Sequence, residues 1–299
     1  MLVNPMNKLV FDIGASAIKY ALMDDLANIY EKGSVSTPKD TLEHFLTELK
    51  NIYMIFKGRI DGIAISIPGT IDANTGQIYA PGGLAYNENV NLIEEMRAFT
   101  QLPIAMENDG KSAALAELWK GDLQGCQDGV VLVLGSGIGG GIIKDGKLWK
   151  GKHLFAGEFS YIMGDKADEF TDVWAMKAST TALIMNVAKK KSMDMKELNG
   201  YQIFQMIQDK DEAAYEALEE VCDSIAKGIF NLQCILDPEK VLIGGGISKQ
   251  PILLEKIQER LDLLYTKLPF DVPHASVSTC RFYNDSNLIG ALYNFMMQH

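Results

Sequence analysis

The sequence predicts an α/β fold made of two similar halves. Short apolar runs that end in glycine alternate with longer segments whose apolar residues recur at helical spacing, a pattern typical of strands alternating with helices. In addition, LVFDIGASAIKYALMDD (9–25) and LVLGSGIGGGIIKDG (132–146) share one pattern: an apolar strand, a turn of small residues, a second apolar strand and an acidic turn. This internal repeat favours a duplicated fold whose two halves close on one ligand.

In the first half, the apolar runs 9–14 and 17–24 are expected to pair as a hairpin of strands. The elements expected after them are a helix at 41–56, a strand at 62–69, a helix at 92–101, a strand at 102–109 and a helix at 110–121. The strand at 102–109 delivers Glu107, Asn108 and Asp109 at its carboxyl end, which is where the clefts of α/β proteins form.

The second half opens with a strand at 130–134, and the residues after its glycine turn are expected to form another strand, because Asp145-Gly146 is a hairpin-turn signal. The elements expected after it are helices at 173–190, 197–208 and 211–236, a strand at 240–247 and helices at 251–268 and 287–297. We expect the last helix to pack back on the first half.

Composition and charge disfavour several classes of function. The 299 residues carry a formal net charge of −11, and an acidic chain repels a nucleic-acid backbone. The start of the sequence has no apolar run long enough for a signal peptide or a membrane span. The cysteines form no C-x-x-C pair, so we expect neither a disulfide framework nor a cysteine zinc site. We therefore expect a cytoplasmic protein without a nucleic-acid or membrane partner.

Gly135, Gly137 and Gly140 match the G-x-G-x-x-G pattern of dinucleotide-binding folds, but that pattern needs a helix directly after the turn. Here a strand is expected instead, which disfavours NAD. Two interpretations stay open: a purely structural turn, and a hairpin turn whose backbone N–H groups bind phosphates. The turn Asp12-Ile-Gly14-Ala-Ser16 would then supply the opposite side of the same site. Asp12 suits a magnesium ion held through water, although it is also an ordinary turn residue.

Five short motifs in order resemble the ROK family, a group of bacterial sugar kinases, repressors and relatives in the actin-like ATPase superfamily. They are Asp12-Ile-Gly14, Glu107-Asn108-Asp109, the glycine turn at 135–141, Ala156-Gly157-Glu158 and Ile243-Gly244-Gly245-Gly246. The resemblance implies a two-lobed, ribonuclease H-like α/β fold with sheets duplicated around a central cleft. We expect a smaller lobe formed by 1–115 with 285–299 and a larger lobe formed by 116–284. The family often dimerises, which favours a homodimer.

The resemblance also implies roles for single residues. Asp109 is the expected base, which accepts the proton of the attacking sugar hydroxyl; the alternative is that Asp109 only caps the following helix. The expected sugar ligands are Asn108, Glu158, Gly69, Gly82, Gly83 and Tyr161. The residues expected at ATP and Mg²⁺ are Asp12, Gly14, Ser16, Gly135, Ser136, Gly137, Gly139, Gly140, Gly244, Gly245 and Gly246. For Glu158 the alternative is a solvated acid beside Lys152.

The chain departs from the family pattern after Ala156-Gly157-Glu158. Tyr161 stands where most members have histidine, and residues 162–179 contain no cysteine or histidine, so we expect no zinc. This variant is similar to the zinc-less β-glucoside kinase branch, which implies phosphoryl transfer to the 6-hydroxyl of a glucosyl unit, as in cellobiose. Phe159, Tyr161 and Trp174 could stack on a second sugar ring or pack in the core.

Other functions stay open. The main alternative is a kinase for glucose, another hexose or an N-acetylhexosamine, since sugar choice rests on few contacts. A non-catalytic sugar-binding protein is an alternative of another class. A repressor is disfavoured by the acidic charge and by the position of Asp12 near the start of the sequence, which leaves little room for a DNA-binding segment before it.

Overall fold

The computed structural model describes residues 7–164 and 172–299, and the chain folds into two compact units. The first unit contains the residues up to Lys120, Lys150–Phe155 and Asp285–His299. The second contains Gly121–Trp149 and Ala156–Asn284. The lobe boundaries expected from the sequence stay predictions; the one at 115/116 would fall inside a helix that spans Asp109–Lys120.

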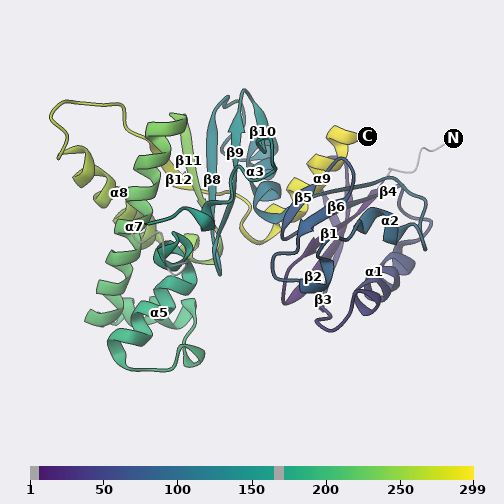
Figure 1. The fold of residues 1–299 in the computed structure, drawn as a ribbon, viewed down its shortest axis with the longest axis horizontal. Coiled ribbons are helices and arrows are strands. Elements are labelled where there is room, and N and C mark those ends of the chain that lie inside the picture. Colours follow the sequence, from purple (N-terminus) through teal and green to yellow (C-terminus); the bar gives the residue numbers. More distant parts are fainter. Residues whose placement is uncertain (1–6, 165–171) are drawn as a thin grey trace. The chain divides into compact units, whose positions relative to one another are not determined.

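The first unit is built on a five-stranded sheet with the order β3-β2-β1-β4-β7 (Figure 1). Its strands are β1 (Asn7–Ile13), β2 (Ala17–Asp24), β3 (Ile29–Ser36), β4 (Gly62–Ile67) and β7 (Ile104–Asn108). β1 and β2 form the predicted antiparallel hairpin, while β4 runs parallel to both β1 and β7. β1, β4 and β7 are almost wholly buried, as expected for central parallel strands.

The second unit repeats this plan with the order β10-β9-β8-β11-β12. Its strands are β8 (Gly129–Leu134), β9 (Ile138–Lys144), β10 (Lys147–Trp149), β11 (Lys240–Gly244) and β12 (Ser276–Thr279). β8 and β9 form an antiparallel hairpin, and β11 lies parallel between β8 and β12. The predicted duplication is therefore present as two sheets of the same connectivity.

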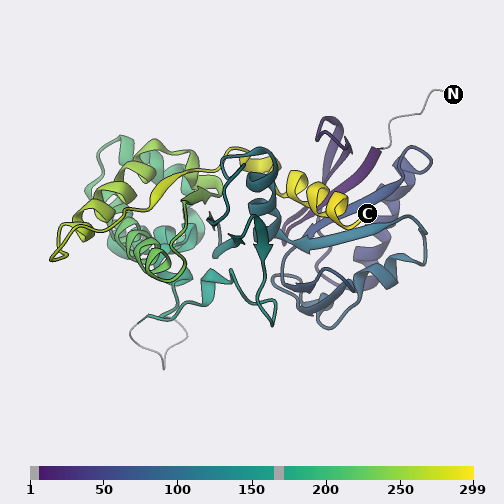
Figure 2. The same cartoon turned by 90° about the horizontal axis from the view of Figure 1, so that it is seen from above.

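Helices complete each unit. In the first unit they are α1 (Leu42–Phe56), α2 (Leu92–Met96), α3 (Asp109–Lys120) and α9 (Ser286–Gln298), with a small sheet of β5 (Thr70–Asp72) and β6 (Gln77–Ala80). In the second they are α4 (Ala175–Ala178), α5 (Thr180–Lys191), α6 (Gly200–Gln208), α7 (Glu212–Leu236) and α8 (Pro251–Tyr265). α9 packs on α3, β4 and β7, so the C-terminal helix returns to the first unit as predicted (Figure 2).

Some expected elements differ from the structure. The helix expected at 92–101 ends after Met96, and the residues that follow form turns. The helix expected at 173–190 is divided at Ser179, whose hydroxyl caps α5 by accepting a hydrogen bond from the N–H of Ala182. β3 (IYEKGSVS) was not expected, because its residues are mostly polar and none is fully buried at this edge of the sheet.

Among the described residues, none of the helices combines the length and the apolar character that a membrane crossing requires.

Candidate active site

The first glycine turn lies between β1 and β2 and is held by the backbone around it. The N–H of Gly14 donates to the carbonyl of Ala17 at 2.9 Å. Thr37 holds the turn from β3, because its hydroxyl donates to the carbonyl of Gly14 at 2.7 Å and its N–H to that of Ser16 at 3.2 Å. Within the described chain, the N–H groups of Ala15 and Ser16 make no hydrogen bond. The turn thus offers two exposed donors to an anion.

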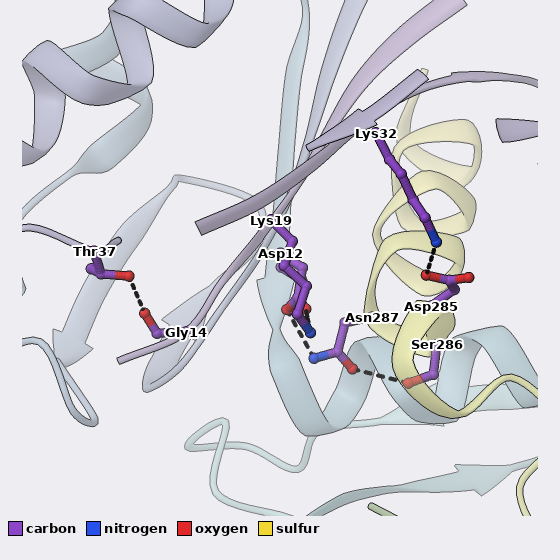
Figure 3. Close-up of polar contacts among 9 residues, drawn as sticks. Asp12, Gly14, Lys19, Lys32, Thr37, Asp285, Ser286 and Asn287 are labelled. Carbon is purple, nitrogen blue, oxygen red and sulfur yellow. Dashed lines mark hydrogen bonds and ion pairs between the residues drawn. The ribbon is translucent and has the colours of Figure 1, made fainter. Parts of the chain in front are cut away.

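Asp12 lies in β1 just before this turn, and its side chain is only 7% exposed. Oδ2 forms an ion pair with Nζ of Lys19 at 3.1 Å, and Oδ1 accepts a hydrogen bond from Nδ2 of Asn287 at 2.9 Å (Figure 3). The hydroxyl of Ser66 lies 3.5 Å from Oδ1. The side chains of Lys19, Asn287 and Ser66 therefore hold the carboxylate in place, and its expected role at Mg²⁺ stays a prediction.

The second glycine turn joins β8 to β9, and the N–H of Gly135 donates to the carbonyl of Gly137 at 3.0 Å. A strand follows this turn, so the dinucleotide-binding unit with its helix is absent here. Ser160 fixes the end of the turn, since its hydroxyl accepts a hydrogen bond from the N–H of Ile138 at 2.8 Å. Ser136 is exposed at the tip.

Gly139 and Gly140 lie inside β9, beyond the turn itself. A Cβ on Gly140 would lie 1.9 Å from the carbonyl oxygen of Val131, so packing against β8 already requires glycine there. The expected nucleotide role of these two residues stays a prediction.

The Gly244–Gly246 loop follows β11 and lies against the start of the second turn. Gly245 has φ +95°, and a Cβ there would lie 2.2 Å from the carbonyl oxygen of Leu134. Leu134 directly precedes Gly135, so the second unit brings these two glycine segments together. Only glycine allows this approach and this backbone angle.

The carboxyl end of β7 and the first turn of α3 carry the expected sugar and base residues. Nδ2 of Asn108 donates to the carbonyl of Gly69 at 2.9 Å, and its Oδ1 accepts from the N–H of Lys111 at 3.0 Å. Asn108 therefore caps α3, so the alternative that Asp109 serves as this cap is wrong. Oδ1 of Asp109 accepts from the N–H of Gly110 at 2.8 Å.

Two loops, at Gly69 and at Gly82-Gly83, pack between this end of β7 and the first glycine turn. Gly69 has φ +118°, and a Cβ there would lie 2.1 Å from the carbonyl oxygen of Ala80. A Cβ at Gly82 would lie 2.9 Å from Pro68, and a Cβ at Gly83 would lie 3.0 Å from Ala15. The first unit thus gathers the predicted residues Gly14, Ser16, Gly69, Gly82, Gly83, Asn108 and Asp109 through a continuous chain of contacts.

The buried ion pair between Glu107 and Lys150, next to the candidate site, was not predicted from the sequence. Glu107 is 1% exposed; one carboxylate oxygen accepts from the N–H of Asn108 at 2.9 Å, and the other pairs with Nζ of Lys150 at 2.9 Å. The pair ties the residue before Asn108 to the segment Lys150–Phe155 of the same unit. The sequence separation of 43 residues explains why no local pattern indicates it.

In the second unit, the aromatic residues after Glu158 separate into two groups. Phe159 and Trp174 are 3% and 6% exposed and contact each other edge to face, so both belong to the core. Tyr161 is 49% exposed. Glu158 is partly buried at the start of the short 3₁₀ turn that contains Phe159 and Tyr161. The segment 162–179, whose sequence contains no cysteine or histidine, lies partly outside the described residues, so the expected absence of zinc stays a prediction.

The carboxylate of Asp12 in the first unit is a suitable ligand for a magnesium ion. Mg²⁺ commonly uses one or two carboxylates together with waters and substrate phosphates. Asp12 supplies one nearly buried carboxylate beside a turn with open N–H donors. Among the described residues there is no group of three or more His, Cys, Asp or Glu side chains that would enclose a metal ion by themselves.

Comparisons with known proteins agree with this architecture. The ROK family model matches residues 9–297. A β-glucoside kinase of Listeria monocytogenes is 30% identical over 98% of this chain and 98% of its own. A glucokinase of Halalkalibacterium halodurans is 27% identical over 93% of this chain and 92% of its own. The crystal structure of a ROK family protein from Streptococcus pneumoniae in complex with sucrose has a TM-score of 0.89 at 28% identity, covering 98% and 99% of the two chains.

The fold is thus the α/β fold of ROK kinases, with duplicated sheets of the actin-like ATPase type. The family model covers nearly the whole chain, and both named relatives are sugar kinases. This protein belongs to the ROK family and is similar to its sugar kinases over almost its full length.

Proposed function

We propose that this protein is an ATP-dependent sugar kinase that transfers the γ-phosphoryl group to the 6-hydroxyl of a glucosyl unit, preferentially in a β-glucoside such as cellobiose. The observation that carries the proposal is the end of β7, where Asn108 joins Gly69 to the first turn of α3 and presents Asp109 next to it. The full-length similarity to a β-glucoside kinase supports the same activity.

Asp109 is the base in this proposal. Phosphoryl transfer needs a positioned carboxylate that accepts the proton of the attacking hydroxyl. Because Asn108 caps α3, helix capping does not require the carboxylate of Asp109. Asn108 and Glu158 would bind sugar hydroxyls, and the backbone of Gly69 and the Gly82-Gly83 loop would line the sugar.

ATP is the proposed phosphoryl donor. The turns at Gly14–Ser16 and Gly135–Gly137 would bind its phosphates through backbone N–H groups, and Gly244–Gly246 its adenosine. Asp12 would hold Mg²⁺ through water; the ion, when bound, neutralises charge on the phosphates. The open N–H groups of Ala15 and Ser16 support this assignment.

The β-glucoside preference is supported by Tyr161. This residue replaces the family's histidine, and it is half exposed, whereas Phe159 and Trp174 are core residues. An exposed aromatic ring suits stacking on a second sugar ring. The alternative is a glucokinase or N-acetylhexosamine kinase, for which the 27% identical glucokinase is a precedent.

Asp109→Asn tests the base assignment. We expect the variant to keep its affinity for the sugar and to lose turnover about 100- to 10,000-fold, because the amide accepts no proton. Sugar affinity is measured by calorimetry and turnover by coupled ADP release. Asp145→Asn is the matched control: Asp145 is exposed in a hairpin turn with φ +52°, which asparagine also adopts.

Near-wild-type turnover of Asp109→Asn would remove this residue from the base role. Sugar binding by the wild type without any ADP release would instead favour a non-catalytic sugar-binding protein.

A further inference from the structure

Lys19 lies in β2 just after the first glycine turn, and the proposed reaction gives it no role. In the antiparallel pairing of β1 with β2, Lys19 lies directly opposite Asp12. Side chains of directly opposed residues point to the same face of a sheet. Lys19 therefore extends on the face that carries Asp12, one residue pair before the hairpin closes at Ile13 and Ile18.

Asn287 and Lys19, two of the partners of Asp12, differ in how firmly they are held. Asn287 lies in the first turn of α9, and the hydroxyl of Ser286 donates to its Oδ1 at 3.4 Å (Figure 3). This helix packs on the core of the first unit, so Asn287 is part of a rigid frame. The side chain of Lys19, in contrast, is 46% exposed. Its long side chain can therefore move its ammonium group without a movement of the backbone.

The anion site lies in the turn of the same hairpin, where Ser16 comes three residues before Lys19. Ala15 and Ser16 are exposed residues, and their N–H groups make no hydrogen bond within the described residues. They are donors of fixed direction, whereas the ammonium group of a lysine carries three donors on a flexible stem. A phosphate bound at the turn would compete with the carboxylate of Asp12 for that ammonium group.

On the basis of the proposed function, we infer that Lys19 is a ligand of the nucleotide phosphates, and that in the nucleotide-free protein Asp12 keeps its ammonium group beside the turn. When a triphosphate binds, Nζ leaves Oδ2 of Asp12 for a phosphate oxygen. Asp12 stays in place through Asn287, and Oδ2, no longer paired with Lys19, would be available to hold Mg²⁺ through water. The ligand class is a nucleoside polyphosphate; the sugar does not take part in this contact.

Lys19→Met tests the inference by binding rather than by activity. The substitution keeps most of the length of the side chain and removes its charge. We expect the Kd of the non-hydrolysable analogue AMPPNP with MgCl₂, measured by calorimetry, to rise about tenfold, the equivalent of one charge-assisted hydrogen bond. The Kd of adenosine, measured by NMR titration, should not change, because adenosine has no phosphate. Lys19→Arg should retain most of the AMPPNP affinity.

Lys32→Met is the matched control. Lys32 lies on the neighbouring strand β3, opposite Ala21 and farther from the turn, and its ammonium group is 3.5 Å from Asp285 (Figure 3). Its side chain is 60% exposed, and we expect its loss to leave AMPPNP binding unchanged.

Unchanged AMPPNP affinity in Lys19→Met would overturn the inference and leave the proposed kinase function intact. An equal loss of adenosine and AMPPNP affinity would also overturn it, because that result indicates a structural role for Lys19. If the wild type bound neither compound, the proposed function itself would fall together with the inference.

Discussion

The side chain of Asn108 shows how much of the site depends on single residues. Its amide joins the loop at Gly69 to the first turn of α3. The sequence indicated that Asn108 and Asp109 lie at a strand end, because the apolar run before them and the helical pattern after them are local signals. It did not indicate the bond to Gly69, 39 residues away, because long-range contacts leave no local pattern. The pairing of Lys19 with Asp12 depends on the register of the β1–β2 hairpin, which the sequence pattern did not specify.

Lys150→Met tests the contribution of the buried carboxylate next to Asn108. Glu107 would keep its charge in the interior without its cation, and removing one partner of a buried pair is strongly destabilising. Because the side chain of Lys150 is 23% exposed, we expect a loss of only about 2 kcal/mol in the free energy of unfolding, measured with urea.

The control for this prediction is Lys147→Met, at an exposed position of β10. Adding Glu107→Gln to Lys150→Met should recover part of the stability, because the uncompensated charge is then gone. Equal stability of Lys150→Met and Lys147→Met would show that the ion pair contributes nothing measurable.

At the scale of elements, strong local patterns were reliable and mixed ones were not. The hairpins β1-β2 and β8-β9 were predicted because apolar strands flank turns of small residues. α2 is shorter than expected. The apolar residues after Met96 continue the helical spacing, but the backbone there forms hydrogen-bonded turns. β12 was missed because it is a short strand whose position depends on pairing with β11, which no local pattern encodes.

Gly290→Ala tests the packing of α9 on α3. A Cβ at this position would lie 1.7 Å from the carbonyl oxygen of Ser112, which is backbone and cannot rotate away. We expect overpacking to lower the free energy of unfolding by about 1 to 3 kcal/mol. Urea unfolding measures it, with Met297→Ala on the same helix, 52% exposed, as control.

Alanine is the better helix former by about 1 kcal/mol, so relaxed packing would make Gly290→Ala more stable than the wild type. That result would contradict the close contact between the two helices.

At the scale of the whole molecule, the internal sequence repeat was the feature that best predicted the fold. Two sheets with one connectivity follow from two similar hairpin sequences, and the order of the five motifs along the chain indicated the family. The substrate could not be predicted to the same depth, because it depends on a few side chains such as Tyr161 rather than on the fold.

The stability of the molecule should fall at alkaline pH. Burial raises the pKa of the Tyr86 hydroxyl and of the Cys222 thiol to about 12, from ordinary values of 10.0 and 9.0. Both groups keep their protons in the folded chain at pH values where the unfolded chain releases them. The folded state then binds more protons, so the free energy of unfolding decreases as the pH rises above about 9.

Urea unfolding from pH about 8 to about 11 measures this effect, and Cys222→Ala should reduce the slope. A free energy of unfolding that stayed constant over this range would contradict the raised pKa values of these two groups.

The most direct test of the proposed function is a coupled assay of ADP release with ATP, Mg²⁺ and a panel of cellobiose, glucose and N-acetylglucosamine, with mass spectrometry of the products. We predict a phosphorylated cellobiose and a higher kcat/KM for cellobiose than for glucose. Phosphorylation of glucose alone would contradict the β-glucoside preference, and the absence of ADP release with every sugar would contradict the kinase function.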